Sequence, residues 1–275
     1  MNESPLELIG QKEGATSIIL VGVHGNERCG IKAFEKLLPI LEIETGRVLF
    51  MYGNPKAIEQ NMRSTEANLN RMFKPDNLLS EQEKQSYEYT RSQTLKKYLD
   101  QADVLLDIHA SFTPESRAFI ICEQNAKDIV KHLPFDLLVH GFDNVEPGGT
   151  DYYMNSKGKI GVCIECGYLD DPNSENIAQK SILSFLAAQG HISEPTKEYS
   201  QAEISMYSIY LTETDNFILS KTFRDFEKVT KGQLIGMDGE RGVRADRDSI
   251  ILFAQNRTNA GDEGFLLGTI KNSAS

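Results

Sequence analysis

The sequence predicts an α/β fold, in which a mostly parallel mixed sheet is flanked by helices and followed by a small C-terminal all-β domain. Two observations lead to this prediction. Up to about residue 190, short apolar runs typical of buried strands alternate with segments whose apolar residues recur at helical spacing. Beyond about residue 199, short strand-like runs are separated by glycines and charged residues, without a long helical pattern.

The elements expected in the first part follow from apolar spacing and from turn signals such as Gly53-Asn54-Pro55. Strands are predicted over residues 17–23, 47–52, 104–108, 118–122, 137–139 and 161–164, and helices over residues 31–41, 81–100, 125–133, 150–154 and 175–189. The connection after residue 55 is long and polar, and long connections of this kind often have a functional role. A polar linker near residue 195 divides the chain into domains 1–195 and 196–275.

Composition limits the partners and the compartment. The 275 residues carry a net charge of −11 without a basic run, which argues against nucleic acid and anionic membranes as partners. The longest apolar run is far shorter than the ~20 residues of a membrane span. The N-terminal residues Met1–Pro5 do not form an export signal, and four cysteines are too few for a disulfide scaffold, so a cytoplasmic location is expected. Cys163 and Cys166 resemble a redox or zinc half-site, but a buried strand is the better interpretation.

The strand over residues 17–23 delivers a candidate metal pair, His24 and Glu27, at its carboxyl end. Gly22 and Gly25 allow the sharp bend that would turn both side chains towards one cation. The spacing alone is weak evidence, because with 5 His and 40 acidic residues about one match is expected by chance. The same spacing recurs after His140 and His191, which we interpret as surface residues.

Position in the predicted fold, and not spacing, distinguishes the pair of His24 and Glu27 from the matches after His140 and His191. In parallel sheets, ligands bind outside the carboxyl ends of the strands. His24, His109 and Glu165 each follow a predicted strand, and Arg63, Asn70 and Arg71 lie in the long connection after another strand. Taken alone, His109 would be a core histidine and Arg71 a partner of a surface acid. Together, these residues predict a metal site at one edge of the sheet.

Four ordered motifs carry a resemblance to a known family: Val23-His24-Gly25-Asn26-Glu27, Asn70-Arg71, Asp107-Ile108-His109 and Ile164-Glu165-Cys166-Gly167. In this order they resemble the succinylglutamate desuccinylase/aspartoacylase family, a branch of the zinc carboxypeptidase-like hydrolases. The resemblance covers roughly residues 17–190, and the later β segment is similar to that family's C-terminal domain.

The resemblance implies a zinc site, with another divalent transition metal as the alternative. His24, Glu27 and His109 would bind one ion and leave its fourth position to a water, whose pKa would fall to about 7. Glu165 would act as general base by accepting the proton of that water. A carboxylate buried among apolar residues is costly, which is a further reason to assign Glu165 a function.

The resemblance also implies substrate contacts. Arg63 would hold the carbonyl oxygen as it becomes anionic, and Asn70 and Arg71 would bind a substrate carboxylate. Two departures matter. Residue 68 is Asn where the family usually has Asp, which affects the affinity or the identity of the metal. The family's aspartoacylases also carry an arginine shortly before the catalytic glutamate, and Arg117 is the candidate replacement here.

The expected function is therefore zinc-dependent amide hydrolysis of a small carboxylate-bearing molecule, such as an N-acyl amino acid. A metallocarboxypeptidase acting on short peptides and an inactive binding protein that retains the fold are the alternatives. The sequence leaves the substrate, the oligomeric state and the role of the C-terminal segment open.

Overall fold

A computed structural model describes residues 3–271 of the chain. Its main feature is an 11-stranded sheet in the order β1-β3-β2-β4-β7-β5-β6-β8-β14-β13-β10. The strands from the first part of the chain are β1 (Leu6–Ile9), β2 (Lys12–Val21), β3 (Thr45–Tyr52), β4 (Val104–Ser111), β5 (Phe119–Cys122), β6 (Leu137–His140) and β7 (Ile160–Tyr168). Met1 and Asn2, on which the expectation of no export signal partly rests, lie outside the described residues.

The sheet is mixed and mostly parallel in its first part. β2 pairs in parallel with β3 and β4, β4 pairs in parallel with β7, and β5 pairs in parallel with β6. β1 and β5 introduce antiparallel pairs, with β3 and β7 respectively. The predicted fold class is thus confirmed, although β1 was not foreseen.

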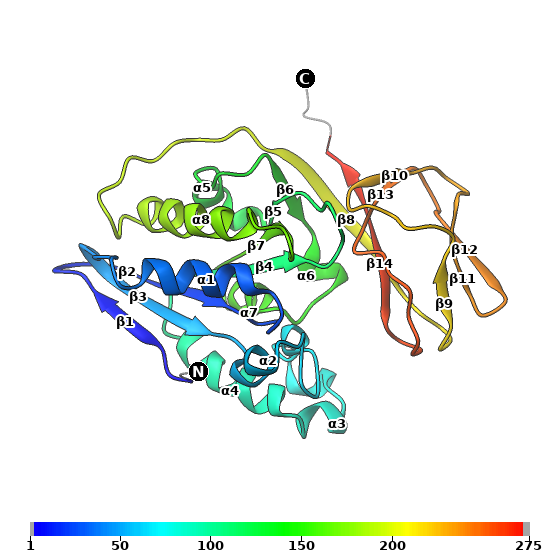
Figure 1. Cartoon of the computed structure of the whole chain (residues 1–275), viewed down its shortest axis with the longest axis horizontal. Coiled ribbons are helices and arrows are strands. Elements are labelled where there is room, and N and C mark those ends of the chain that lie inside the picture. The colour runs from blue at the N-terminus through cyan, green and yellow to red at the C-terminus, as the bar shows by residue number, and fades with distance from the viewer. Residues whose placement is uncertain (1–2, 272–275) are drawn as a thin grey trace.

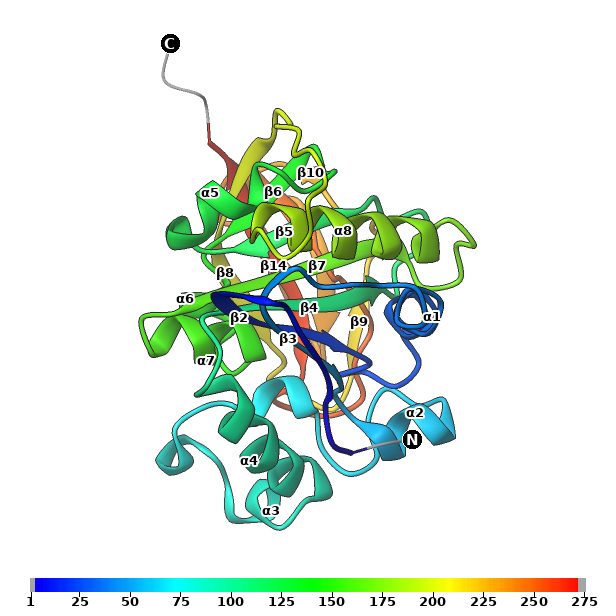
Figure 2. The same cartoon turned by 90° about the vertical axis from the view of Figure 1, so that its left-hand side faces the viewer.

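Helices cover both faces of this sheet (Figures 1 and 2). The longer helices are α1 (Arg28–Leu37), α4 (Tyr87–Leu99) and α8 (Ser174–Ala188). The shorter ones are α2 (Pro55–Gln60), α3 (Glu81–Lys84), α5 (Lys127–Val130), α6 (Phe142–Val145) and α7 (Thr150–Ser156), with 3-10 turns at Leu69–Arg71, Asp76–Leu78 and Gln124–Ala126. α1 and α8 pack on one face and α4 and α7 on the other, so each face carries its own apolar core. None of the described helices is long and apolar enough to span a membrane.

Local sequence explains where several elements end. The helix predicted over residues 81–100 is interrupted after α3, because the Ser86 side chain accepts a hydrogen bond from Tyr89 and begins α4 anew. Cys163 and Cys166 lie on β7, and all four cysteines are free and buried, as expected for small apolar strand residues.

The turn after β2 depends on two glycines. Gly22 has a φ of +68°, a backbone conformation that other residues rarely adopt. At Gly25, a Cβ would lie 2.1 Å from the backbone carbonyl carbon of Ala57, so any side chain would clash with the first turn of α2. The expected sharp bend between β2 and α1 is therefore present, and it requires glycine at both positions.

The C-terminal part extends the same sheet. β8 (Ala202–Leu211) pairs in parallel with β6 and is followed in the sheet by β14 (Glu263–Ile270), β13 (Ser249–Leu252) and β10 (Glu227–Val229). A separate three-stranded sheet contains β9 (Phe217–Leu219), β11 (Leu234–Asp238) and β12 (Arg241–Arg244). All helices of the described residues precede this part, as predicted. The division at residue 195 stays a prediction, since β8 is hydrogen-bonded across it.

The long connection between α2 and α4 is organised by one buried carboxylate, that of Glu88. Its oxygens accept hydrogen bonds from the backbone N–H groups of Thr65, Glu66 and Ala67 at 2.7, 3.2 and 3.2 Å, and from the Asn54 side chain at 3.1 Å. Burial alone would raise the pKa of Glu88, but these hydrogen bonds lower it. Glu88 thus fixes the segment between Arg63 and Asn68, which the candidate site uses.

Replacement of Glu88 tests this role. Glu88→Gln should lower the free energy of unfolding by about 2–3 kcal/mol, because an amide group would turn N–H donors towards backbone N–H donors. Urea denaturation measures the difference. Glu81→Gln is the control, since the Glu81 side chain is 86% exposed and its pair with Lys84 contributes little. Equal unfolding free energies for the two variants would contradict the assignment.

Candidate metal centre

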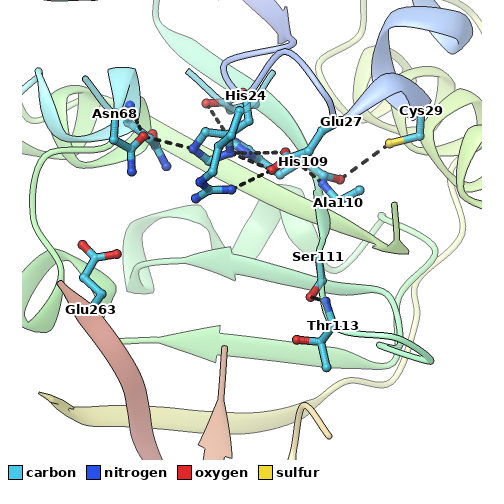
Figure 3. Close-up of polar contacts among 12 residues, drawn as sticks. His24, Glu27, Cys29, Asn68, His109, Ala110, Ser111, Thr113 and Glu263 are labelled. Carbon is cyan, nitrogen blue, oxygen red and sulfur yellow. Dashed lines mark hydrogen bonds and ion pairs between the residues drawn. The ribbon is translucent and has the colours of Figure 1, made fainter. Parts of the chain in front are cut away.

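Three side chains converge at the carboxyl edge of the sheet. His24 and Glu27 come from the turn between β2 and α1, and His109 comes from β4 (Figure 3). Glu27 Oε1 lies 2.7 Å from His24 Nδ1, Glu27 Oε2 lies 2.9 Å from His109 Nδ1, and the two Nδ1 atoms are 3.2 Å apart. All three side chains are buried. Two imidazole nitrogens and a carboxylate that face one point could hold a metal ion.

The spacing of these atoms suits a tetrahedral zinc ion. Ligand bonds of about 2.0–2.2 Å at tetrahedral angles place neighbouring ligand atoms roughly 3.3–3.6 Å apart. The observed separations are slightly shorter, so a small outward movement of each side chain would accommodate the ion. The donor set itself, with two His nitrogens and one carboxylate, is ordinary for zinc.

The far nitrogen of each histidine faces an orienting group. Asn68 Oδ1 forms a hydrogen bond of 3.1 Å with His24 Nε2, and Asp107 Oδ2 lies 3.2 Å from His109 Nε2, at ion-pair distance but without hydrogen-bond geometry. Such partners fix the tautomer and the ring orientation of metal-binding histidines. Asp107 also accepts a hydrogen bond from Thr150 Oγ1. The sequence analysis assigned no role to Asp107, although its position two residues before His109 on the same face of β4 was a usable signal.

The two histidines differ in their protonation. Burial, with help from Arg63, lowers the pKa of His24 to about 4, so its imidazole is neutral at neutral pH. Burial alone would also lower the pKa of His109, but the carboxylates of Asp107 and Glu27 raise it well above its usual value. The two acids therefore favour the protonated imidazole of His109, with Glu27 at Nδ1 and Asp107 at Nε2.

Glu165 stands beside this cluster because of strand register. β4 and β7 are parallel, and His109 pairs directly with Glu165, so both side chains leave the sheet on the same face. Burial raises the pKa of Glu165 well above its usual value, and the charge of Glu27 adds to the effect. Glu165 Oε2 is buried without a hydrogen-bond partner among the described residues.

These groups line a single cleft. The structure brings seven of the eight predicted site residues into it: His24, Glu27, Arg63, Asn70, Arg71, His109 and Glu165. Arg63 Nη1 donates to Glu27 Oε1 at 3.2 Å. Asn70 Oδ1 is buried and has no hydrogen-bond partner in the described part of the chain.

Arg117 is the exception, and its predicted contact with the substrate needs correction. Its side chain is 51% exposed, and its Nη2 pairs with Asp136 Oδ2 at 2.5 Å on the surface. It lies two residues before β5 and is not among the residues that line the cleft. Arg117 therefore does not replace the arginine that the family's aspartoacylases carry.

The interpretation of His140 and His191 as surface residues was also wrong. His140 is 3% exposed and its Nδ1 lies 2.7 Å from the carbonyl oxygen of Cys122. His191 is fully buried, with Nδ1 2.7 Å from the carbonyl oxygen of Thr45 and Nε2 2.6 Å from Ser17 Oγ. Both are core histidines that bond to neighbouring strands. His140 Nε2 has no hydrogen-bond partner among the described residues and lies 3.3 Å from Glu203 Oε2. Neither histidine belongs to the metal-binding cluster.

The cleft contains charged residues that the sequence analysis missed. Those from the first part of the chain are Asp143, Glu146 and Asp151, and those from the C-terminal part are Arg257 and Glu263. Burial raises the pKa of Asp151 to about 7 and that of Glu146 to about 8. Apart from the match of Asp143 to the spacing after His140, no motif marks these residues, and only the folded chain brings them together.

With this geometry in place, the chain can be compared with known proteins. Residues 13–189 match the succinylglutamate desuccinylase/aspartoacylase catalytic domain. This match covers more than half of the 275 residues. The chain therefore belongs to the succinylglutamate desuccinylase/aspartoacylase family.

Individual relatives are distant. N-alpha-acetyl-L-2,4-diaminobutyric acid deacetylase of Halomonas elongata is 27% identical over 276 residues, which cover 90% of this chain and 79% of the relative. Succinylglutamate desuccinylase of Pseudomonas aeruginosa is 37% identical over 78 residues, but this match spans only 24% of its length. The crystal structure of succinylglutamate desuccinylase from Vibrio cholerae has a TM-score of 0.82 at 16% identity, over 99% of this chain and 87% of that chain. The structural likeness confirms the fold.

Glu146 gives a pH-dependence prediction. Its pKa is about 8 in the folded chain and near 4.5 when exposed, so the folded state holds a proton that the unfolded state releases. Stability contributed by this proton is complete below pH 4.5 and is lost as the pH rises towards 8. Glu146→Gln stays neutral, so it should gain stability relative to the wild type between pH 5 and 8.5, by at most about 1.4 kcal/mol per pH unit.

Urea denaturation at several pH values in the presence of a chelator measures this gain without a contribution from metal binding. Glu240→Gln is the control, because Glu240 is exposed and its replacement removes the same charge. A constant difference between Glu146→Gln and the wild type across this range would contradict the prediction.

Proposed function

We propose that the protein is a zinc-dependent hydrolase that cleaves an amide bond of a small carboxylate-bearing substrate of the N-acyl amino acid type. One observation carries the proposal: the ligand atoms of His24, Glu27 and His109 converge beside the unpaired carboxyl group of Glu165 in a single cleft. Membership of the family and the names of the relatives support the same reaction.

His24, Glu27 and His109 would hold the metal. When bound, zinc would supply a Lewis acid that lowers the pKa of a water to about 7. The protein prepares for this by keeping His24 neutral and by surrounding the site with buried groups, which exclude bulk water. Asn68 and Asp107 would hold the two imidazole rings in the orientation that presents Nδ1 to the ion.

Glu165 would act as the general base and then as the general acid. Its Oε2 has no competing partner among the described residues, so it is free to accept a proton from a nucleophilic water. The same carboxyl group would return that proton to the leaving amine. Burial raises the pKa of Glu165 well above its usual value, which favours the protonated form that would return the proton to the leaving amine.

Arg63 and Asn70 would contact the substrate. The Arg63 side chain is 46% exposed at the cleft and is tied to Glu27, so its guanidinium lies close to the metal ligands. A cation in this position would stabilise the carbonyl oxygen as negative charge develops on it. Asn70 Oδ1 lies unpaired in the same cleft and would accept a hydrogen bond from the substrate.

Two experiments separate this proposal from the alternatives. Elemental analysis of the purified protein should find one zinc ion per chain, and failure to bind zinc even on titration would contradict the metal site. Hydrolysis assays with N-acetyl and N-succinyl amino acids and with short peptides distinguish a deacylase from a carboxypeptidase. A protein that binds zinc but hydrolyses neither set would be the inactive binding protein.

Glu165 can be tested separately from the metal. Glu165→Gln should retain one zinc ion per chain and lose turnover by about 10²–10⁴-fold, because the amide cannot accept the proton of the water. Initial rates and metal content, measured on the same samples, check both parts. The exposed Glu240→Gln variant should match the wild type. Unchanged turnover in Glu165→Gln would remove Glu165 from the mechanism.

Asn68 gives a test of metal affinity. Asn68→Asp should bind zinc about tenfold more tightly, since a carboxylate that accepts from His24 Nε2–H makes the imidazole a better ligand. Competition with a chromophoric chelator measures the dissociation constant. Asn61→Asp adds the same charge to the same segment at an exposed position. Equal affinities for the two variants would mean that general charge, not the contact with His24, sets the affinity.

A further inference from the structure

Arg71, which the resemblance assigns to the substrate carboxylate, already forms hydrogen bonds and ion pairs within the protein. Arg71 Nε donates to Glu263 Oε1 at 2.6 Å and its Nη2 donates to Glu263 Oε2 at 3.0 Å, which is the two-pronged geometry of an arginine–carboxylate pair. Its Nη2 also pairs with Glu146, and its Nη1 donates to the carbonyl oxygen of Asn70 at 2.7 Å. No edge of this guanidinium is open to a second carboxylate.

Displacement of Glu263 by a substrate would be costly. The Arg71 side chain is only 14% exposed, and Glu146 beside it is 9% exposed. Glu263 stands at the start of β14, across the site from the His24–Glu27–His109 cluster (Figure 3). A released Glu263 would leave a carboxylate next to the incoming one, and Arg71 cannot neutralise both. Arg71 therefore joins the C-terminal strands to the first part of the chain.

Arg257 offers what Arg71 lacks. It lies between β13 and β14 and lines the same cleft. Its backbone is held by two hydrogen bonds with Phe217, at 2.9 and 3.0 Å, and its Nε donates to the carbonyl oxygen of Glu263 at 2.6 Å. Within residues 3–271, no hydrogen bond or ion pair involves its Nη1 or Nη2. The side chain is thus fixed at Nε and presents its two outer nitrogens.

Arg63, the third arginine that lines the cleft, already contacts another residue. Arg63 donates from Nη1 to Glu27, so its guanidinium lies beside the candidate metal ligands. The proposed function assigns the scissile carbonyl to this position. A substrate carboxylate needs a second cation farther from the metal ligands. Arginine stays charged at any pH of interest, and its outer edge matches both oxygens of a carboxylate.

We propose that Arg257 binds the carboxylate of the substrate and that Arg71 serves as a structural link to Glu263. The assignment rests on the proposed function for the class of substrate. It makes the C-terminal part a contributor to the site, because the residue that selects for a carboxylate comes from the loop before β14.

Paired substrates test the assignment. Each protein is assayed with the N-acyl amino acid that the wild type hydrolyses best and with the corresponding primary carboxamide, in which the carboxylate is neutral. Arg257→Gln should lower kcat/KM for the carboxylate at least 30-fold, mainly through KM, and change kcat/KM for the carboxamide less than threefold. Arg257→Lys should fall between the two, because it keeps the charge and loses the two-pronged contact.

Arg247→Gln is the matched control, since Arg247 is an exposed arginine of the same C-terminal part that pairs with Asp246. Thermal unfolding and zinc content check that each variant is folded. If Arg257→Gln does not fold, the comparison of Arg257→Lys with the wild type decides. Retention of the wild-type preference for the carboxylate in the folded variants overturns the assignment.

A binding measurement separates the failure of this assignment from the failure of the proposed function. Zinc-loaded wild type and Arg257→Gln are titrated with succinate by calorimetry, which requires no turnover. At least tenfold weaker binding to Arg257→Gln supports the assignment even if no amide is hydrolysed. Equal binding, or no binding to either protein, overturns it, whether or not the wild type is an active hydrolase.

Discussion

The candidate site depends on the parallel pairing of β2, β4 and β7. Val21 pairs with Ile108, and His109 pairs with Glu165, so the turn after β2 meets His109 and Glu165 at one level near the carboxyl edge of the sheet. A shift of one residue in either pairing would turn the affected side chains to the opposite face. Because the C-terminal half of β2 and nearly all of β4 and β7 are buried, packing on both faces opposes such a shift. The geometry of the ligands is thus a consequence of core packing.

Two buried carboxylates attach less regular segments to this frame. Glu88 fixes the connection that carries Arg63 and Asn68, through hydrogen bonds to consecutive backbone N–H groups. Glu263 fixes the C-terminal strands through Arg71, which lies 192 residues earlier in the chain. Burying such charges is unfavourable unless every oxygen is satisfied, so each contact specifies one arrangement of its segment. Polar contacts therefore position the segments around the cleft, and apolar packing stabilises the central sheet.

Strand ends explain what the sequence could predict. His24 follows β2, as predicted. His109 and Glu165 lie inside β4 and β7, because these strands extend beyond the predicted ranges 104–108 and 161–164, but both residues are near the carboxyl ends that parallel strands place together. The prediction for Arg117 failed because it came from proximity in sequence to a missing arginine, without a strand end to place its side chain. Arg257 was missed for the same reason, since its position depends on how the C-terminal strands pack.

Burial also changes the charge of the cleft. The cleft contains more acidic than basic side chains, which would repel an anionic substrate if all were ionised. Burial raises the pKa values of Asp151 and Glu146 to about 7 and about 8, so near neutral pH these two acids are at least partly protonated. Arg257 is then less offset by its neighbours than the composition suggests. Burial thus lowers the net negative charge that the cleft would present to the proposed carboxylate substrate.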